Sequence, residues 1–122
     1  MNQAYAAMNP SKVDRNRLVA LTDLPNIGEA SAQDLRLLGI HQPSQLVGKC
    51  PLDMYEMLCA KTATRHDPCV IDVFMSITRF MAGEEPQPWW AYTEERKQLL
   101  KQKNVTEMKF GCATVDDLSG NF

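Results

Sequence analysis

Apolar residues recur along the chain at three- and four-residue spacing, which is the period of an amphipathic α-helix. The strongest pattern covers residues 68–82, the most apolar segment, which we expect at the centre of the core. Weaker patterns of the same period predict helices over residues 11–21, 29–38, 44–47, 51–62 and 93–103. No segment alternates apolar and polar residues as a half-buried strand does. The sequence therefore predicts an all-α domain of about five to six helices.

Turn-forming residues divide the chain into three parts. Residues 1–10 are small and polar and end in Asn9-Pro10, which is typical of a flexible N-terminal arm. Residues 11–103 hold the predicted helices, with proline at expected starts such as Pro51 and glycine at expected ends such as Gly39. Residues 104–122 carry apolar side chains without a period, so we expect a C-terminal extension outside the helical domain.

Residues 21–40 have the sequence LTDLPNIGEASAQDLRLLGI, which resembles a helix-hairpin-helix. In that motif a Leu-Pro turn and a glycine join two helices, which cross closely at a small residue, here Ala32. Gly28 has no side chain, so a phosphate could approach the backbone N–H groups that open the second helix. In nucleic-acid-binding members of that superfamily the turn contacts the sugar–phosphate backbone without reading bases. The resemblance therefore implies sequence-independent DNA binding.

The leading hypothesis is weak binding to the DNA backbone. Its expected contacts are the turn and three basic residues of the helix before it: Pro25, Asn26, Ile27, Gly28 and Glu29, with Lys12, Arg15 and Arg17. Glu29 opposes this binding, because a carboxylate ~7 Å from a phosphate costs about 0.6 kcal/mol in water. The alternative hypothesis is a purely structural hairpin, within a helical module that binds another protein or forms homo-oligomers.

Three further segments extend the resemblance beyond the turn. They are Arg65-His66-Asp67-Pro68-Cys69, Pro88-Trp89-Trp90 and Thr93-Glu94-Glu95-Arg96-Lys97. Together with the turn they resemble the bacterial pathogenicity-locus family, which is also described as mitomycin-resistance-associated. More distantly, the turn and the helices after it are similar to the C-terminal domain of TfoX-type competence regulators. The family implies a small helical bacterial protein with a DNA-related role, and it supplies no reaction.

Few residues are suited to catalysis. Cys59, His66 and Cys69 are candidate metal ligands, but zinc takes four tetrahedral ligands and no fourth residue stands at a known spacing. Cys69 is also a candidate nucleophile beside His66, although nothing indicates an oxyanion site. A metal- or thiol-dependent enzyme is thus the third hypothesis, and we predict no metal, cofactor or enzymatic activity. Trp89 and Trp90 have two interpretations, stacking on unpaired bases or anchoring the last helix to the core.

Charge and hydropathy limit the partners further. Thirteen Lys and Arg against fifteen Asp and Glu give a net charge of −2, which excludes a surface coated in positive charge. Residues 96–103 contain four basic residues, whereas residues 23–34 contain three acids and no base, so the turn is locally acidic. No apolar run approaches the ~20 residues of a membrane span, and the first residues lack a secretory signal. Four cysteines without a CxxC pair favour reduced thiols in a cytoplasmic protein.

Overall fold

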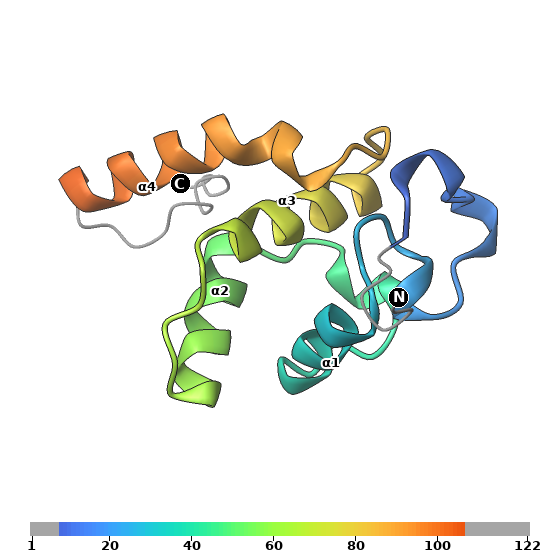
Figure 1. Cartoon of the computed structure of the whole chain (residues 1–122), viewed down its shortest axis with the longest axis horizontal. Helices are drawn as coiled ribbons and strands as arrows, with labels where there is room; N and C mark the ends of the chain where they lie inside the picture. The colour runs from blue at the N-terminus through green and yellow to red at the C-terminus, as the bar shows by residue number, and fades with distance from the viewer. Residues whose placement is uncertain (1–7, 107–122) are drawn as a thin grey trace.

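The computed structural model describes residues 8–106 and confirms the all-α prediction, with no strand in that range (Figure 1). Its four α-helices are α1 (Glu29–Leu37), α2 (Pro51–Thr62), α3 (Cys69–Met81) and α4 (Thr93–Thr106). Short 3-10 turns precede and connect them: η2 (Pro10–Lys12), η3 (Arg15–Arg17), η4 (Leu21–Asp23), η5 (Pro43–Leu46) and η6 (Trp89–Tyr92). Residues 1–7 of the expected arm and residues 107–122 of the expected extension lie outside the described residues.

Helix α3 lies at the centre of the fold, with α2 packed on one side and α4 on the other (Figure 1). Its inward face supplies the largest group of fully buried side chains: Ile71, Phe74, Met75, Ile77 and Phe80. Burial of an apolar side chain of this size stabilises the folded state by about 1.5–3 kcal/mol relative to leaving it exposed. The most apolar segment of the sequence therefore forms the centre of the core, as predicted.

The end of α1 follows the glycine signal in the sequence. Gly39 takes a left-handed φ of 84°, and its N–H donates to Arg36 O at 2.9 Å. The N–H of Ile40 donates to Leu35 O at 3.0 Å, and the Ile40 side chain is buried. These two bonds form a Schellman motif, which satisfies the last carbonyl groups of the helix. The predicted glycine stop of this helix is confirmed.

The prediction of a helix over residues 11–21 is wrong. This stretch forms the separate 3-10 turns η2, η3 and η4 with extended residues between them. Side-chain oxygens accept hydrogen bonds from nearby backbone N–H groups. Asn9 Oδ1 accepts from Ser11 N at 2.9 Å, and Asp14 Oδ1 accepts from Asn16 N at 2.9 Å. Such local bonds compete with an α-helix. The short helix predicted over residues 44–47 is likewise a 3-10 turn, η5. The described residues therefore hold four α-helices rather than five to six, and a helix-hairpin-helix arrangement is not confirmed.

The α-helices in the described part of the chain are all either too short or too polar to cross a membrane.

Candidate binding groove beside the 25–29 turn

The turn at residues 25–29, to which the sequence analysis assigned phosphate binding, is largely buried and hydrogen-bonded within the chain. Its first four residues are buried, and only Glu29 is exposed. The N–H of Asn26 donates to Met8 O at 2.8 Å, and the N–H of Met8 donates to Ile27 O at 3.4 Å. The N–H of Ile27 donates to Leu24 O at 3.4 Å. The N–H groups of Asn26 and Ile27, two of the residues expected to contact a phosphate, are thus already hydrogen-bonded within the protein.

Asn26 joins this turn to two other parts of the fold. Its φ of 66° lies in the left-handed region, which Asn tolerates better than most residues. Its side-chain amide donates to Ser76 Oγ on α3 at 3.0 Å and to Gln87 O at 2.8 Å. Only 8% of the residue is exposed. The sequence predicts the backbone conformation of Asn26, but its side-chain contacts with positions far along the chain carry no local signal.

The N-terminus of α1 remains open beyond the closed turn. Gly28 caps the helix, and the first bond from the helix runs from Ala32 N to Gly28 O at 2.9 Å. Within residues 8–106, the N–H groups of residues 29–31 have no acceptor. The Glu29 carboxylate is bonded to Arg36 at 3.1 Å, two helical turns further along α1. The carboxylate is therefore held away from these N–H groups.

The basic residues expected near the turn have other partners. Arg15 donates from Nη1 to Phe80 O at 2.6 Å and from Nη2 to Glu84 O at 2.7 Å, and its guanidinium lies 4.0 Å from the centre of the Phe80 ring. Arg15 therefore satisfies carbonyls at the end of α3. The other two expected cations line a hollow of about 510 Å³ together with two carboxylates and two apolar residues: Lys12, Arg17, Asp14, Asp23, Met8 and Val19. Since its described lining holds two cations and two carboxylates, that lining is close to neutral in charge.

A larger groove, of about 580 Å³, includes Asn26 of the turn in its lining and is called the Trp90 groove below. Two segments, called its walls below, supply most of the described lining: residues 8–11, and Pro86, Pro88, Trp89 and Trp90. Asn26 completes the described lining and is bonded to Met8 O of the first wall and to Gln87 O beside the second. None of these described lining residues is charged. The two indole rings meet edge to face at 5.5 Å. Trp90 is 64% exposed, whereas Trp89 is half-buried, so the pair presents one open aromatic surface.

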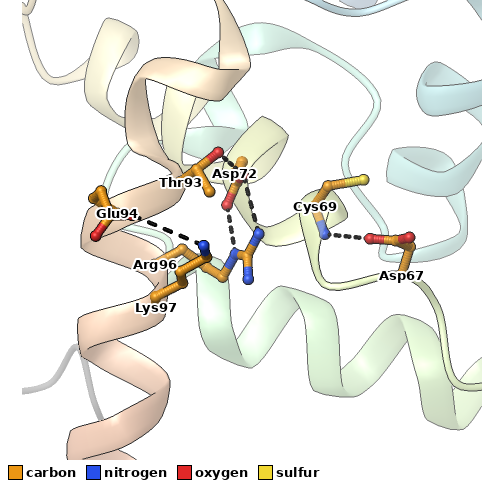
Figure 2. A network of polar contacts seen from close by, with 7 residues as sticks. All are labelled: Asp67, Cys69, Asp72, Thr93, Glu94, Arg96 and Lys97. Carbon is orange, nitrogen blue, oxygen red and sulfur yellow. Dashed lines mark hydrogen bonds and ion pairs between the residues drawn. The ribbon is translucent and has the colours of Figure 1, made fainter.

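A buried ion pair holds α4 beside this groove (Figure 2). Asp72 on α3 is fully buried and accepts from Thr93 Oγ1 at 2.7 Å and from Arg96 Nε at 2.8 Å. This bond to Asp72 raises the pKa of Arg96. Lys97 lies 3.8 Å from Glu94 on the surface. Two of the four basic residues counted in the last helix are therefore paired within the protein.

The candidate metal ligands do not form a cluster. His66 contacts Thr62 Oγ1 through Nε2 at 2.9 Å and donates from its backbone N–H to Cys59 Sγ at 3.4 Å. Among the described residues, no three His, Cys, Asp or Glu side chains lie close enough to share a metal ion. Cys59 and Cys69 are free thiols.

Cys69 also lacks the properties of a nucleophile. Burial, followed by a hydrogen bond from the thiol to Asp67, raises the pKa of Cys69 to about 11. Asp67 Oδ1 accepts from the backbone N–H of Cys69 at 2.8 Å, as drawn in Figure 2. The thiolate is the reactive form, so a thiol with this pKa is almost entirely unreactive at neutral pH. Burial, together with the nearby carboxylates, therefore outweighs the effect of the helix N-terminus on which the nucleophile interpretation depended.

Comparison with known proteins identifies the family. The model of the pathogenicity-locus family matches residues 14–98, which include the turn, the buried ion pair and the tryptophan pair. The chain belongs to this family. It is 40% identical over 80 residues to the mitomycin resistance protein McrB of Streptomyces lavendulae, and the match covers 66% of this chain and 76% of the relative. No solved structure matches the pathogenicity-locus family protein. The first wall of the Trp90 groove, residues 8–11, lies outside the family match.

Proposed function

We propose that this pathogenicity-locus family protein is a helical module that binds an extended, uncharged segment of a partner protein in the Trp90 groove. The observation that carries the proposal is a groove beside the turn whose described lining is uncharged and includes a 64% exposed tryptophan. In this proposal the turn is structural, as in the alternative weighed from the sequence. Its role is to hold residue 26, and with it the two walls of the groove, in place.

The chemistry of the lining supports this class of partner. Tryptophan and proline rings offer flat apolar surfaces, and grooves of aromatic residues accept extended proline-rich segments whose backbone is already ordered. A charged side chain in such a groove would lose water without gaining an ion-pair partner, which is unfavourable. Tryptophan is also enriched among the few residues that dominate the binding energy of an interface. These properties favour an uncharged, proline-containing segment over a nucleic acid in this groove.

An uncharged proline-rich decapeptide is the first probe. We expect it to shift the indole N–H signal of Trp90 in a ¹H–¹⁵N spectrum of the full chain, whereas a glycine–serine decapeptide leaves that signal in place. Trp90→Ala should weaken binding about 30-fold, which corresponds to about 2 kcal/mol for a central aromatic residue. Val47→Ala is the matched control, because Val47 is 62% exposed and does not line the groove. Equal affinities of the two variants, or no shift with the proline-rich peptide, would overturn the proposal.

A second candidate function is weak binding to the DNA backbone at the N-terminus of α1. The observation that favours it is the set of N–H groups at residues 29–31, which have no acceptor in the described part of the chain and from which the ion pair with Arg36 draws the Glu29 carboxylate away. A helix N-terminus contributes about 0.3–1 kcal/mol toward a bound anion in an exposed setting. Since Arg15 is engaged with carbonyl groups, this candidate has fewer cations than the sequence suggested.

Charge changes at Ala30 test the DNA candidate without disturbing the core, because Ala30 is exposed in the first turn of α1. For a labelled duplex at 50 mM salt, Ala30→Glu should weaken binding and Ala30→Lys should strengthen it, each about threefold for a charge ~7 Å from the phosphate. Affinity should also fall linearly with the logarithm of salt concentration. Trp90→Ala serves as the control and should leave duplex binding unchanged. Undetectable duplex binding by the unmodified chain and by both Ala30 variants would remove this candidate.

A further inference from the structure

The side chain of Asn26 has one polar atom, Oδ1, without a partner among the described residues. Its amide nitrogen donates to Ser76 Oγ at 3.0 Å and to Gln87 O at 2.8 Å, so both of its N–H bonds are used. Gln87 O can only accept, and Ser76 Oγ already donates to Val73 O at 2.6 Å. These two neighbours therefore identify which end of the amide is the nitrogen. Within residues 8–106, no group donates to the oxygen at the other end.

The burial of Asn26 indicates that this acceptor faces a ligand. The residue is only 8% exposed, yet it lines the Trp90 groove. Leaving a buried acceptor without a donor is unfavourable, and the large majority of buried polar atoms in proteins are hydrogen-bonded. The other amide and hydroxyl side chains of the described lining, Asn9 and Ser11, are exposed and bonded to each other. A bound segment therefore gains most by offering a donor at Asn26.

An extended proline-rich segment carries such donors at defined places. Its backbone makes no internal hydrogen bonds, so every residue other than proline keeps a free N–H, whereas proline has none. Gln87, whose carbonyl accepts from Asn26, stands three residues before Trp90 in the sequence. The exposed ring of Trp90 suits a proline ring, and Oδ1 suits the N–H of a residue beside that proline.

We infer that Asn26 Oδ1 determines which partner segments bind, by accepting the backbone N–H of one non-proline residue next to a proline packed on Trp90. The inference rests on the proposed function, because it specifies the chemistry of the segment bound in the same groove. A segment made of proline alone covers the apolar surface but leaves the acceptor unpaired. It therefore binds more weakly than a segment with a single N–H at this place.

Two decapeptides that differ by one methyl group test this contact. The first has a central alanine between prolines, with an acetylated N-terminus and a dimethylamide C-terminus, so the alanine N–H is its single N–H. The second carries N-methylalanine at that place and has no N–H. In isothermal titration calorimetry with the full chain, we expect the N-methyl peptide to bind about tenfold more weakly. Equal affinities would overturn the inference and leave the proposed function in place, whereas no binding of either peptide would reject both.

Asn26→Gly assigns the effect to Oδ1, because glycine retains the positive φ and removes the side chain. The tenfold difference between the two peptides should fall to less than about twofold in this variant. Ser11→Ala is the matched control, because it removes another polar side chain of the lining, and it should retain the tenfold difference. A difference that persists in Asn26→Gly would overturn the assignment to Oδ1, because the donor would then bind another acceptor.

A second measurement needs no variant of the protein. With ¹⁵N in the alanine of the first peptide, its amide hydrogen should exchange with solvent at least about tenfold more slowly in the saturated complex than in the free peptide. Exchange that is equally fast in both would show that this N–H donates to no group in the groove. That result would overturn the inference even if Asn26→Gly failed to fold.

Discussion

Arg96→Ala is expected to lower the free energy of unfolding by about 3 kcal/mol, because it leaves a buried carboxylate without its ion-pair partner. Asp72 is fully buried, and its oxygens accept bonds from Arg96 and from the hydroxyl of Thr93. After the substitution one neutral donor remains for a charged group in the core. The side chain of Arg96 is only 14% exposed, so water compensates little of the lost interaction.

Urea denaturation followed by circular dichroism measures this loss. Lys97→Ala is the matched control, since Lys97 follows Arg96 in α4 and its ion pair with Glu94 is exposed, with 58% of the Lys97 side chain accessible. Exposed ion pairs of this kind contribute about 0–1 kcal/mol to the free energy of unfolding. A loss in Arg96→Ala that equals the loss in Lys97→Ala would show that the buried pair does not hold α4. Since α4 follows η6 directly, the same variant should also loosen the position of Trp90.

The helices that could be predicted from the sequence are those that local signals define. Residues 69–81 combine an apolar period with a proline before them and a glycine after them, and each signal acts within a few residues. The end of α1 is equally local, because Gly39 and Ile40 complete a motif of six residues. These parts of the fold are therefore determined by residues that lie close to them in the sequence.

The stretch before the turn could not be predicted in this way. Its apolar residues allow a helix, but Asn9 and Asp14 bind nearby backbone N–H groups and favour short turns instead. Arg15 then bonds to Phe80 O, 65 residues away. A contact at that separation depends on the finished fold and leaves no pattern in the local sequence. The conformation of this segment is therefore decided jointly by its polar side chains and by the end of α3.

The candidate site also combines features with a local sequence signal and features that depend on the finished fold. The sequence identified the 25–29 turn and the tryptophan pair as informative, but it did not place them side by side. Their proximity comes from Asn26, whose amide reaches Gln87 in the connector before the tryptophans. Of the two interpretations of the pair, anchoring suits half-buried Trp89, whereas exposed Trp90 offers a binding surface. The groove is a product of tertiary structure, which explains why sequence reasoning assigned binding to the turn itself.

Asn26→Ala is the second substitution with a large expected effect, a loss of about 3 kcal/mol of unfolding free energy. Two side-chain hydrogen bonds, to Ser76 and to Gln87, contribute about 1 kcal/mol each. The left-handed backbone at φ 66° costs an alanine roughly a further 1 kcal/mol. Because Asn26 links the turn to both α3 and the connector, its loss should also weaken peptide binding in the Trp90 groove.

Asn26→Gly separates the two causes, because glycine adopts a positive φ without strain but makes neither side-chain bond. We expect Asn26→Gly to be more stable than Asn26→Ala by about 1 kcal/mol in urea denaturation, and less stable than the unmodified chain. Asn16→Ala is the control for an exposed asparagine and should change stability by less than about 0.5 kcal/mol. If Asn26→Ala were as stable as Asn16→Ala, the side chain of Asn26 would not hold the turn against α3. The groove would then owe its shape to the backbone pairing of Met8 with the turn rather than to this amide.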